Sequence, residues 1–198
     1  MSLVPAVPAY RRRVAGLSLV EFLVAIAVLA IVVAAGVPSV RNFFERNRLV
    51  GAAEAVYAQA RLARAEALRQ GSAVTLTLLP GKSWCTGHRT EKLRAGPGSA
   101  PEPCDCRRLD ALDPDACTVE SDGDRLLRIT TQAAFPDVSM GESVPAMVRF
   151  NGVRGTASPG TSIALQSESG AALRVDITLS GNVHLCAPGA PFRGYPAC

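Results

Sequence analysis

Apolar side chains are concentrated in one uninterrupted run near the start of the chain. Residues 22–38 read FLVAIAVLAIVVAAGVP and contain no polar side chain, whereas the sequence beyond them is polar and rich in turn residues. A helix over residues 17–40 would be about long enough to span a bilayer, which takes roughly 20 residues. We therefore expect a transmembrane helix half at 17–40, weakened or kinked by Gly36 and Pro38.

The apolar pattern changes to a narrower helical stripe after this run. Apolar residues recur at intervals of four and three, and arginine and glutamate occupy the other faces. The stripe consists of Leu49, Ala53, Val56, Ala60, Ala63 and Ala67. The spacing predicts an amphipathic helix over 41–70 that continues the first half, packs on a domain, and ends at Gly71.

Beyond Gly71 the pattern alternates with a period of two, which is typical of strands. The first such run covers 74–78 and ends at Pro80-Gly81. The later strand candidates are Leu126–Thr130, Ala146–Phe150, Ser162–Leu165, Leu173–Leu179 and Val183–Cys186. Short strands in close succession favour an antiparallel sheet. The sequence thus predicts an α+β fold with a β-domain over 71–198 and a cysteine-rich loop region at 86–124.

The charge of the chain is unevenly distributed. Arg11, Arg12 and Arg13 precede the apolar run without an acidic neighbour. Positive residues beside an apolar helix tend to stay cytoplasmic, so we expect the C-terminal domain on the outer side of the membrane. The net charge is +4, but residues 71–198 carry twelve basic and thirteen acidic side chains. This balance disfavours nonspecific binding of nucleic acid, which requires many phosphate contacts.

One carboxylate, Glu21, lies at the edge of the apolar run, five residues after Gly16. A charged group at this depth is costly in lipid unless it has a partner. An opposite charge on a neighbouring chain would favour the ionised carboxylate. The alternative is an interfacial side chain that reaches the lipid headgroups.

The stretch Gly16-Leu-Ser-Leu-Val-Glu21-Phe, with the run that follows, resembles the class III signal of type IV prepilins and type II secretion pseudopilins. The resemblance implies that residues 1–16 are a leader peptide removed by a prepilin peptidase. It also implies that Leu17, where most members have Phe, becomes a methylated N-terminus. The new amine of one subunit would then pair with Glu21 of its neighbour, and residues 17–40 would form the filament core.

Shorter segments are similar to the GspH/FimT/FimU subgroup. They lie at 37–39, 47–49, 61–71, 150–155 and 179–186. The resemblance implies a pilin-like fold, in which a long helix packs on an antiparallel sheet, in an inner-membrane protein with a periplasmic domain at 41–198. The implied function is that of a minor, FimU-like pilus subunit that primes or joins the pilus for adhesion or twitching motility. The alternative is a GspH-like pseudopilin of type II secretion, and the expected partners are other pilins or pseudopilins.

All six cysteines follow the apolar run, which indicates disulfides in an oxidising compartment. Cys186 and Cys198 are expected to pair and to hold down the C-terminal tail. Two further bridges could join Cys85, Cys104, Cys106 and Cys117. A bridge between Cys104 and Cys106 would be strained by their proximity, which favours pairing each with Cys85 or Cys117. Buried free thiols and a zinc site with His88 are the alternatives.

No catalytic or cofactor site is predicted. Serine, histidine and aspartate are present, but nothing places them in a nucleophile–base arrangement. The carboxylates at 120–124 lack the spacing of a calcium loop, so a solvated turn is expected there.

A third function, DNA uptake, is implied by FimT-like relatives that carry a GRxR-type pattern near the end of the chain. This sequence has Gly181-Asn182-Val183-His184 in the comparable strand, and its tail offers only Arg193. We therefore expect weak DNA binding. The disulfide-closed tail, with Phe192 and Tyr195, is expected to face another subunit instead.

Overall fold

The structure is a computed structural model that describes residues 18–91, 102–121, 123–189, 192 and 194–198, and only the backbone at 34–40. It divides into two compact units, Met1–Arg41 and Asn42–Cys198. Helix α1 (Leu19–Gln70) begins in the first unit and ends in the second. The helix continues without interruption through Gly36 and Pro38. Residues 1–17, which include the expected leader, lie outside the described residues.

Helix α1 ends where the sequence predicts. Gly71 has a positive φ of 60°, which a glycine adopts without steric cost. The N–H of Ser72 donates to the carbonyl of Ala67 at 3.2 Å, and the N–H of Gly71 donates to the carbonyl of Leu68 at 3.4 Å. This is the Schellman arrangement that satisfies the last carbonyls of a helix.

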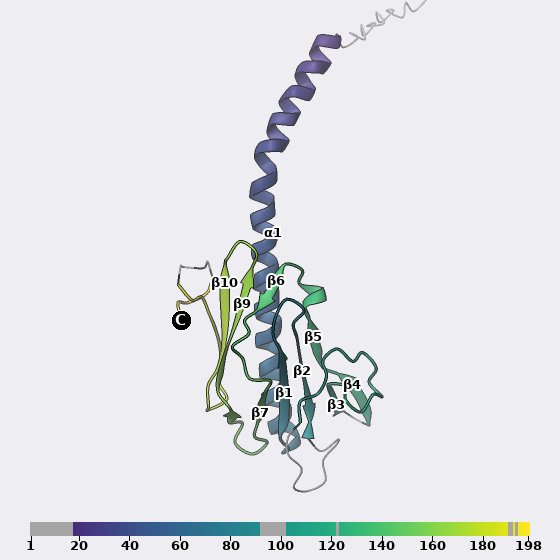
Figure 1. Ribbon diagram of the computed structural model, residues 1–198, viewed down its shortest axis with the longest axis vertical. Helices are drawn as coiled ribbons and strands as arrows, with labels where there is room; N and C mark the ends of the chain where they lie inside the picture. Colours follow the sequence, from purple (N-terminus) through teal and green to yellow (C-terminus); the bar gives the residue numbers. More distant parts are fainter. Residues whose placement is uncertain (1–17, 92–101, 122, 190–191, 193) are drawn as a thin grey trace, which may run out of the picture. The chain divides into compact units, whose positions relative to one another are not determined.

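Two antiparallel sheets and a hairpin accompany α1 in the second unit (Figure 1). The sheets have the orders β5-β2-β1-β7-β8 and β11-β10-β9-β6. The first contains β1 (Val74–Leu79), β2 (Cys85–Thr90), β5 (Ile129–Thr131), β7 (Met147–Phe150) and β8 (Ala157–Ser158). The second contains β6 (Val138–Met140), β9 (Thr161–Ser167), β10 (Ala172–Ile177) and β11 (Val183–Cys186). Strands β3 (Thr118–Ser121) and β4 (Asp124–Leu127) form the hairpin, and the 3-10 helix η2 (Gln132–Ala134) follows β5.

The core confirms the helical stripe predicted from the sequence. Leu49, Val56 and the four alanines of the stripe are at most 1% exposed. They form one cluster with inward-facing residues of both sheets, among them Phe150 of β7 and Leu165 of β9. Alanine lets the backbones approach closely, and the larger side chains of the strands fill the remaining space.

The structure corrects the sequence-based prediction in three places. The region 86–124 is not only a loop, because it contains most of β2 and all of β3. The candidate strand Leu126–Thr130 is divided between β4 and β5, which belong to different sheets. The candidate Leu173–Leu179 ends at Ile177, where the turn to β11 begins. The β-domain therefore has two main antiparallel sheets instead of one.

Strand β2 escaped the sequence pattern because its buried residues are polar. All six of its residues are buried. Thr86 Oγ1 donates to the carbonyl of Thr77 at 2.9 Å, and Arg89 Nη2 donates to the carbonyl of Glu102 at 2.8 Å. These bonds offset the cost of removing polar groups from water. His88 is 1% exposed, and burial, assisted by the charge of Arg128, lowers its pKa to about 4.

We predict that an aspartate at position 56 unfolds the second unit. Val56→Asp places an unpaired carboxylate in the core and should lower the free energy of unfolding by roughly 3 kcal/mol or more. Ala58→Asp, at an exposed position on the same helix, should leave it nearly unchanged. Thermal unfolding of the full chain in detergent, followed by circular dichroism, measures both; equal melting temperatures for the two variants would contradict the packing of α1.

We further predict an acid-sensitive stability that originates from His88. Its folded pKa lies below that of an unfolded histidine, so the unfolded chain binds the extra proton first. Stability is therefore complete above about pH 6.5 and falls as the pH drops toward 4, by up to about 3 kcal/mol. Urea unfolding across this range should lose this slope in His88→Gln. The only other histidine, the exposed His184, provides the control, because His184→Gln should keep the slope.

Candidate functional site

Glu21 lies in the first turn of α1. Its backbone N–H donates to Ser18 Oγ at 3.2 Å, so Ser18 caps the helix. Among the described residues the Glu21 carboxylate has no hydrogen bond or ion pair, and the side chain is exposed. Gly16 and Leu17, the expected cleavage and methylation positions, lie outside the described residues. Within the described chain, Glu21 is therefore a carboxylate available for a partner.

The first turns of α1, around and after Glu21, expose apolar side chains in every direction. Those with large exposed side chains are Leu19, Val20, Phe22, Leu23, Val24, Ile26, Val28, Leu29, Ile31, Val32 and Val33. A helix that is apolar on all faces is stable only in apolar surroundings. Over the part of the chain that the structure describes, no helix reaches the length and hydropathy needed to cross a membrane.

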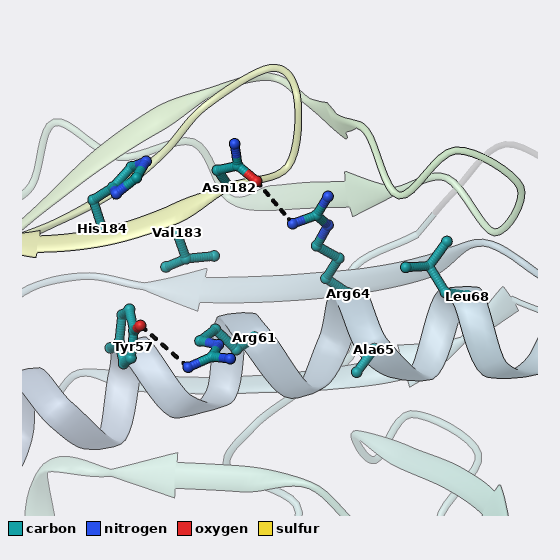
Figure 2. Close-up of a pocket in the computed structure, with 8 residues that line it drawn as sticks. All are labelled: Tyr57, Arg61, Arg64, Ala65, Leu68, Asn182, Val183 and His184. Atoms are coloured by element: carbon teal, nitrogen blue, oxygen red, sulfur yellow. Dashed lines mark hydrogen bonds between the residues drawn. The ribbon is translucent and has the colours of Figure 1, made fainter.

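A groove lies between α1 and strand β11, the edge strand of the second sheet (Figure 2). We call it the β11 groove. It consists of two adjoining cavities of about 470 and 640 Å³ that share Tyr57, Val183 and His184. The first extends to Arg61 and Arg64 on the helix, and the second extends to the C-terminal tail.

The two arginines of the β11 groove differ in their bonding. Arg64 donates from Nε to the carbonyl of Gly155 at 3.1 Å, from Nη1 to Asn182 Oδ1 at 3.0 Å, and from Nη2 to the carbonyl of Ser180 at 3.4 Å. Arg64 thus fastens two turns to the helix. Arg61 is exposed and donates only to Tyr57 Oη, at 3.3 Å, among the described residues (Figure 2). Arg61 is therefore the cation that remains free to bind a ligand.

Gly181 has a packing role at the turn between β10 and β11. A Cβ atom at this position would lie 1.8 Å from the carbonyl oxygen of Gly155, and its φ is 81°. Only glycine allows the two turns to meet under Arg64. The segment 181–184, which stands at the place of the GRxR-type pattern, therefore contributes a structural glycine, an amide bonded to Arg64, and the exposed His184.

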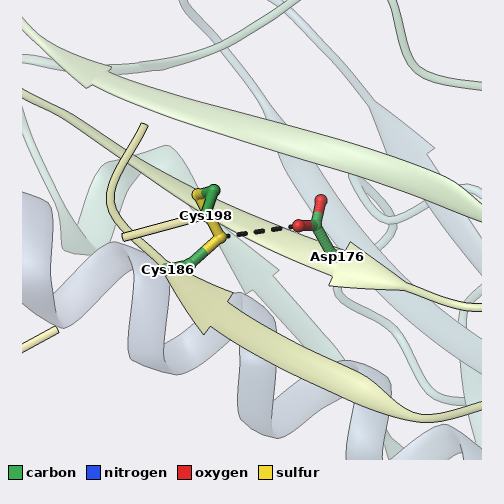
Figure 3. A group of neighbouring side chains, drawn as sticks. All are labelled: Asp176, Cys186 and Cys198. Carbon is green, nitrogen blue, oxygen red and sulfur yellow. Dashed lines mark hydrogen bonds between the residues drawn. A yellow bond between two sulfur atoms is a disulfide. The ribbon is translucent and has the colours of Figure 1, made fainter. Parts of the chain in front are cut away.

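The C-terminal tail is joined to β11 by the disulfide between Cys186 and Cys198 (Figure 3). Asp176 lies beside it, with Oδ2 3.5 Å from Cys186 Sγ. The three side chains place their potential ligand atoms within 4.8 Å of one another. Both sulfurs are bonded to each other, however, so neither is a thiolate that could bind a metal ion.

The tail aromatics pack on their own domain. Phe192 belongs to the core cluster, and the guanidinium of Arg46 lies 4.1 Å from its ring centre. Tyr195 Oη donates to Glu54 Oε1 at 2.8 Å, and burial and this bond raise the pKa of Tyr195 to about 12. Both rings therefore contact side chains of α1. Arg193 lies outside the described residues.

The four remaining cysteines form two crossed bridges, Cys85–Cys106 and Cys104–Cys117. Their sulfurs are therefore not available for the zinc site considered with His88. The bridges fix the loop at 104–117 onto strand β2. Leu109 and Leu112 project from this loop into solvent. The carboxylates at 120–124 belong to the β3–β4 hairpin, except for Asp122, which lies outside the described residues.

The β11 groove was not predicted from the sequence. The sequence predicts the arginines of α1, Arg46, Arg61 and Arg64, as the polar faces of the helix and as an alternative basic surface, and it predicts β11 only as a strand. Nothing in either segment indicates the other, because about 120 residues separate them and only the folded chain brings them together. The local signal that could have drawn attention to it is Arg61, a cation on a helix face without an acidic partner one turn away.

Comparisons with known proteins give two family matches. A model described as type II transport protein GspH matches residues 52–181, and a prokaryotic N-terminal methylation motif matches residues 11–37. A search of curated proteins found no match.

Among solved structures, the chain is similar to two crystal structures of the type IV minor pilin FimU of Pseudomonas aeruginosa. The first is 21% identical, with a TM-score of 0.48, over 76% of this chain and 99% of that one. The second is 20% identical, with a TM-score of 0.45, over 73% of this chain and all of that one.

Proposed function

The chain belongs to the GspH family of type II transport proteins, and we propose that it serves as a minor subunit of a type IV pilus. Together with the methylation motif at 11–37, membership of this family identifies a pilin or pseudopilin with a membrane-anchoring N-terminal segment. Members of this kind are processed by a prepilin peptidase and assemble with other pilins. The proposal concerns the finer role, in which the subunit joins or primes a pilus for adhesion or twitching motility.

The observation that carries the proposal is the unpartnered Glu21 at the start of an apolar helix, among the residues that the structure describes. Cleavage after Gly16 would create an amine at Leu17, four residues before Glu21. In a filament, the amine of one subunit would lie against Glu21 of the next, and an opposite charge stabilises a carboxylate in apolar surroundings. The apolar faces of 19–33 would pack on neighbouring helices in the filament core and on lipid before assembly.

The same features suit a pseudopilin of type II secretion, and the description of the matching family is the observation that supports this second candidate. The anchor and the processing signal serve both machines in the same way. In either case we place the subunit in the inner membrane with a single pass at 17–40 and with residues 41–198 in the periplasm. The three disulfides support an oxidising compartment for that domain.

A role as a DNA receptor is not favoured. DNA binding requires several arginines or lysines acting together. In the β11 groove all three guanidinium nitrogens of Arg64 donate to the protein itself, which leaves Arg61 as the available cation among the described lining residues.

We predict that Gly16→Val blocks processing. A side chain at the residue before the cut must fit the peptidase site, and valine is too large. The wild-type chain should begin at methylated Leu17, whereas the variant should retain Met1. Mass spectrometry of the two membrane fractions measures this; a wild-type N-terminus at Met1, or beyond the apolar run, would disprove the processing step.

We predict that Glu21→Val inserts into the membrane but assembles poorly, because the amine of the neighbour loses its partner. Incorporation into filaments should fall at least about tenfold, as for the loss of one buried charge pair. Glu142→Val makes the same chemical change at an exposed position of the β-domain and should assemble normally.

The measurement is the amount of subunit in sheared filaments relative to membranes, in a strain that lacks the wild-type gene. Counting pili and assaying secreted proteins in that strain separates the two candidate functions. Loss of pili with normal secretion supports the pilus subunit, and the reverse supports the pseudopilin. Equal incorporation of both variants would show that Glu21 has no role in assembly and is only an interfacial side chain.

A further inference from the structure

We propose that the β11 groove binds an extended, acidic peptide segment of a partner protein, which adds to the open edge of strand β11. This inference concerns the domain at 42–198 and does not depend on the anchor or on Glu21. It rests on backbone groups of the strand to which no described residue bonds, on a pairing that the chain already makes at the same edge, and on the charge of the groove.

The outer edge of β11 has backbone groups without partners among the described residues. In the antiparallel pair with β10, His184 lies opposite Asp176 and Cys186 opposite Arg174. Alternate residues of a strand direct their N–H and C=O groups to opposite neighbours. Ala187, one residue beyond the strand, bonds outward, to the tail. Val183 and Leu185 therefore also direct their N–H and C=O groups outward, and no described residue bonds to these groups.

The C-terminal tail shows how this edge is used. The N–H of Ala187 donates to the carbonyl of Pro196 at 2.8 Å, and the N–H of Cys198 donates to the carbonyl of Ala187 at 3.2 Å. This is a parallel bridge between Ala187 and Ala197 on the outer side of β11. Within the described tail, the bridge at Ala187 is the backbone pairing with the outer edge of β11, and the pairing does not extend to Leu185 or Val183. A segment that bonds to the outward groups of Val183 and Leu185 would complete this edge.

An open strand edge is a template for another strand, and peptides that bind in this way obtain affinity from main-chain bonds and specificity from alternate side chains. The groove supplies main-chain bonding groups and apolar contacts for side chains. Its floor has partly buried apolar side chains, Val183, Leu185 and Tyr57, which pack against the core cluster. These can receive every second side chain of a bound segment, while the backbone of β11 bonds to its main chain.

The charges that line the groove favour an acidic segment, and they favour one end of the groove for its carboxylate. At the end near Asn182, the described lining contains Arg61, Arg64 and His184 and no acidic residue. At the tail end it contains Glu54 and Asp176. A carboxylate on the bound segment would therefore be attracted to Arg61 and repelled from the tail end. A bidentate pair with the free guanidinium nitrogens of Arg61 is the charge-assisted bond of this site.

The test uses the full chain in detergent micelles and synthetic hexapeptides of alternating threonine and valine. One set carries a glutamate at either the first or the last position, a second carries glutamine there, and a third is N-methylated at alternate residues. Fluorescence anisotropy measures affinity, and the amide signals of selectively labelled valine and leucine report on positions 183 and 185. The proposal predicts that a glutamate peptide binds and shifts these amides, and that N-methylation on the bonding side abolishes binding.

The matched variants are Arg61→Ala and Arg107→Ala, which remove the same charge from the groove and from the exposed cysteine-rich loop. Arg61→Ala should weaken the glutamate peptide roughly fivefold or more and leave the glutamine peptide unchanged. Arg107→Ala should change neither.

Three results would overturn the proposal. The first is binding that is absent or insensitive to N-methylation. The second is an Arg61-dependent complex with duplex DNA that displaces the peptide, which would make the groove a nucleic-acid site. The third is a shift of both amides with protein concentration alone, which would assign the groove to a second copy of this chain. Because the purified protein is used without a filament, each result leaves the pilus proposal to its own test.

Discussion

The domain depends on the burial of a narrow alanine stripe of α1 beneath both sheets. Ala53, Ala60, Ala63 and Ala67 are fully buried. Side chains of this size let the strands approach the helix closely, and a larger residue would have to displace a sheet. Since both sheets contact one cluster, the helix sets their positions, and with them the turns that Arg64 fastens. The β11 groove is the space that this arrangement leaves beside the edge of the second sheet.

The parts of the fold that could be predicted from the sequence are those in which one pattern extends over many residues. The stripe on α1 has a strict helical spacing, and Gly71 marks its end with a conformation that suits glycine. Strand β1 alternates valine and leucine with threonine, and in β7, β9 and β10 buried positions alternate with more exposed ones beside a turn. In these segments local preference and tertiary packing agree, which is why pattern analysis succeeds there.

The missed strands depend on contacts that no local pattern shows. Strand β2 reads CTGHRT, and its polar groups can be buried because β1, the loop at 102–104 and a disulfide satisfy or hold them. At Gly87 a Cβ would lie 2.7 Å from the disulfide-bonded Cys117, so the cysteine-rich loop covers the strand closely. Similarly, Arg128 separates β4 from β5 because its carbonyl accepts bonds from Gln59 and from the N–H of His88.

The functional features follow the same division. The spacing of Gly16 and Glu21 is local, and it alone suggests the chemistry of a new amine opposite a carboxylate. The β11 groove requires residues 57–68 of the helix, residues 182–186 and the tail at once. The charge that the groove offers to a ligand also arises only on folding. Arg64 donates all its hydrogen bonds to the loops that contain Gly155 and residues 180–182, whereas Arg61, one helical turn earlier, donates only to Tyr57 among the described residues. Two arginines that look equivalent in the sequence thus acquire different tasks: Arg64 holds the domain together, and Arg61 is left to recognise another molecule.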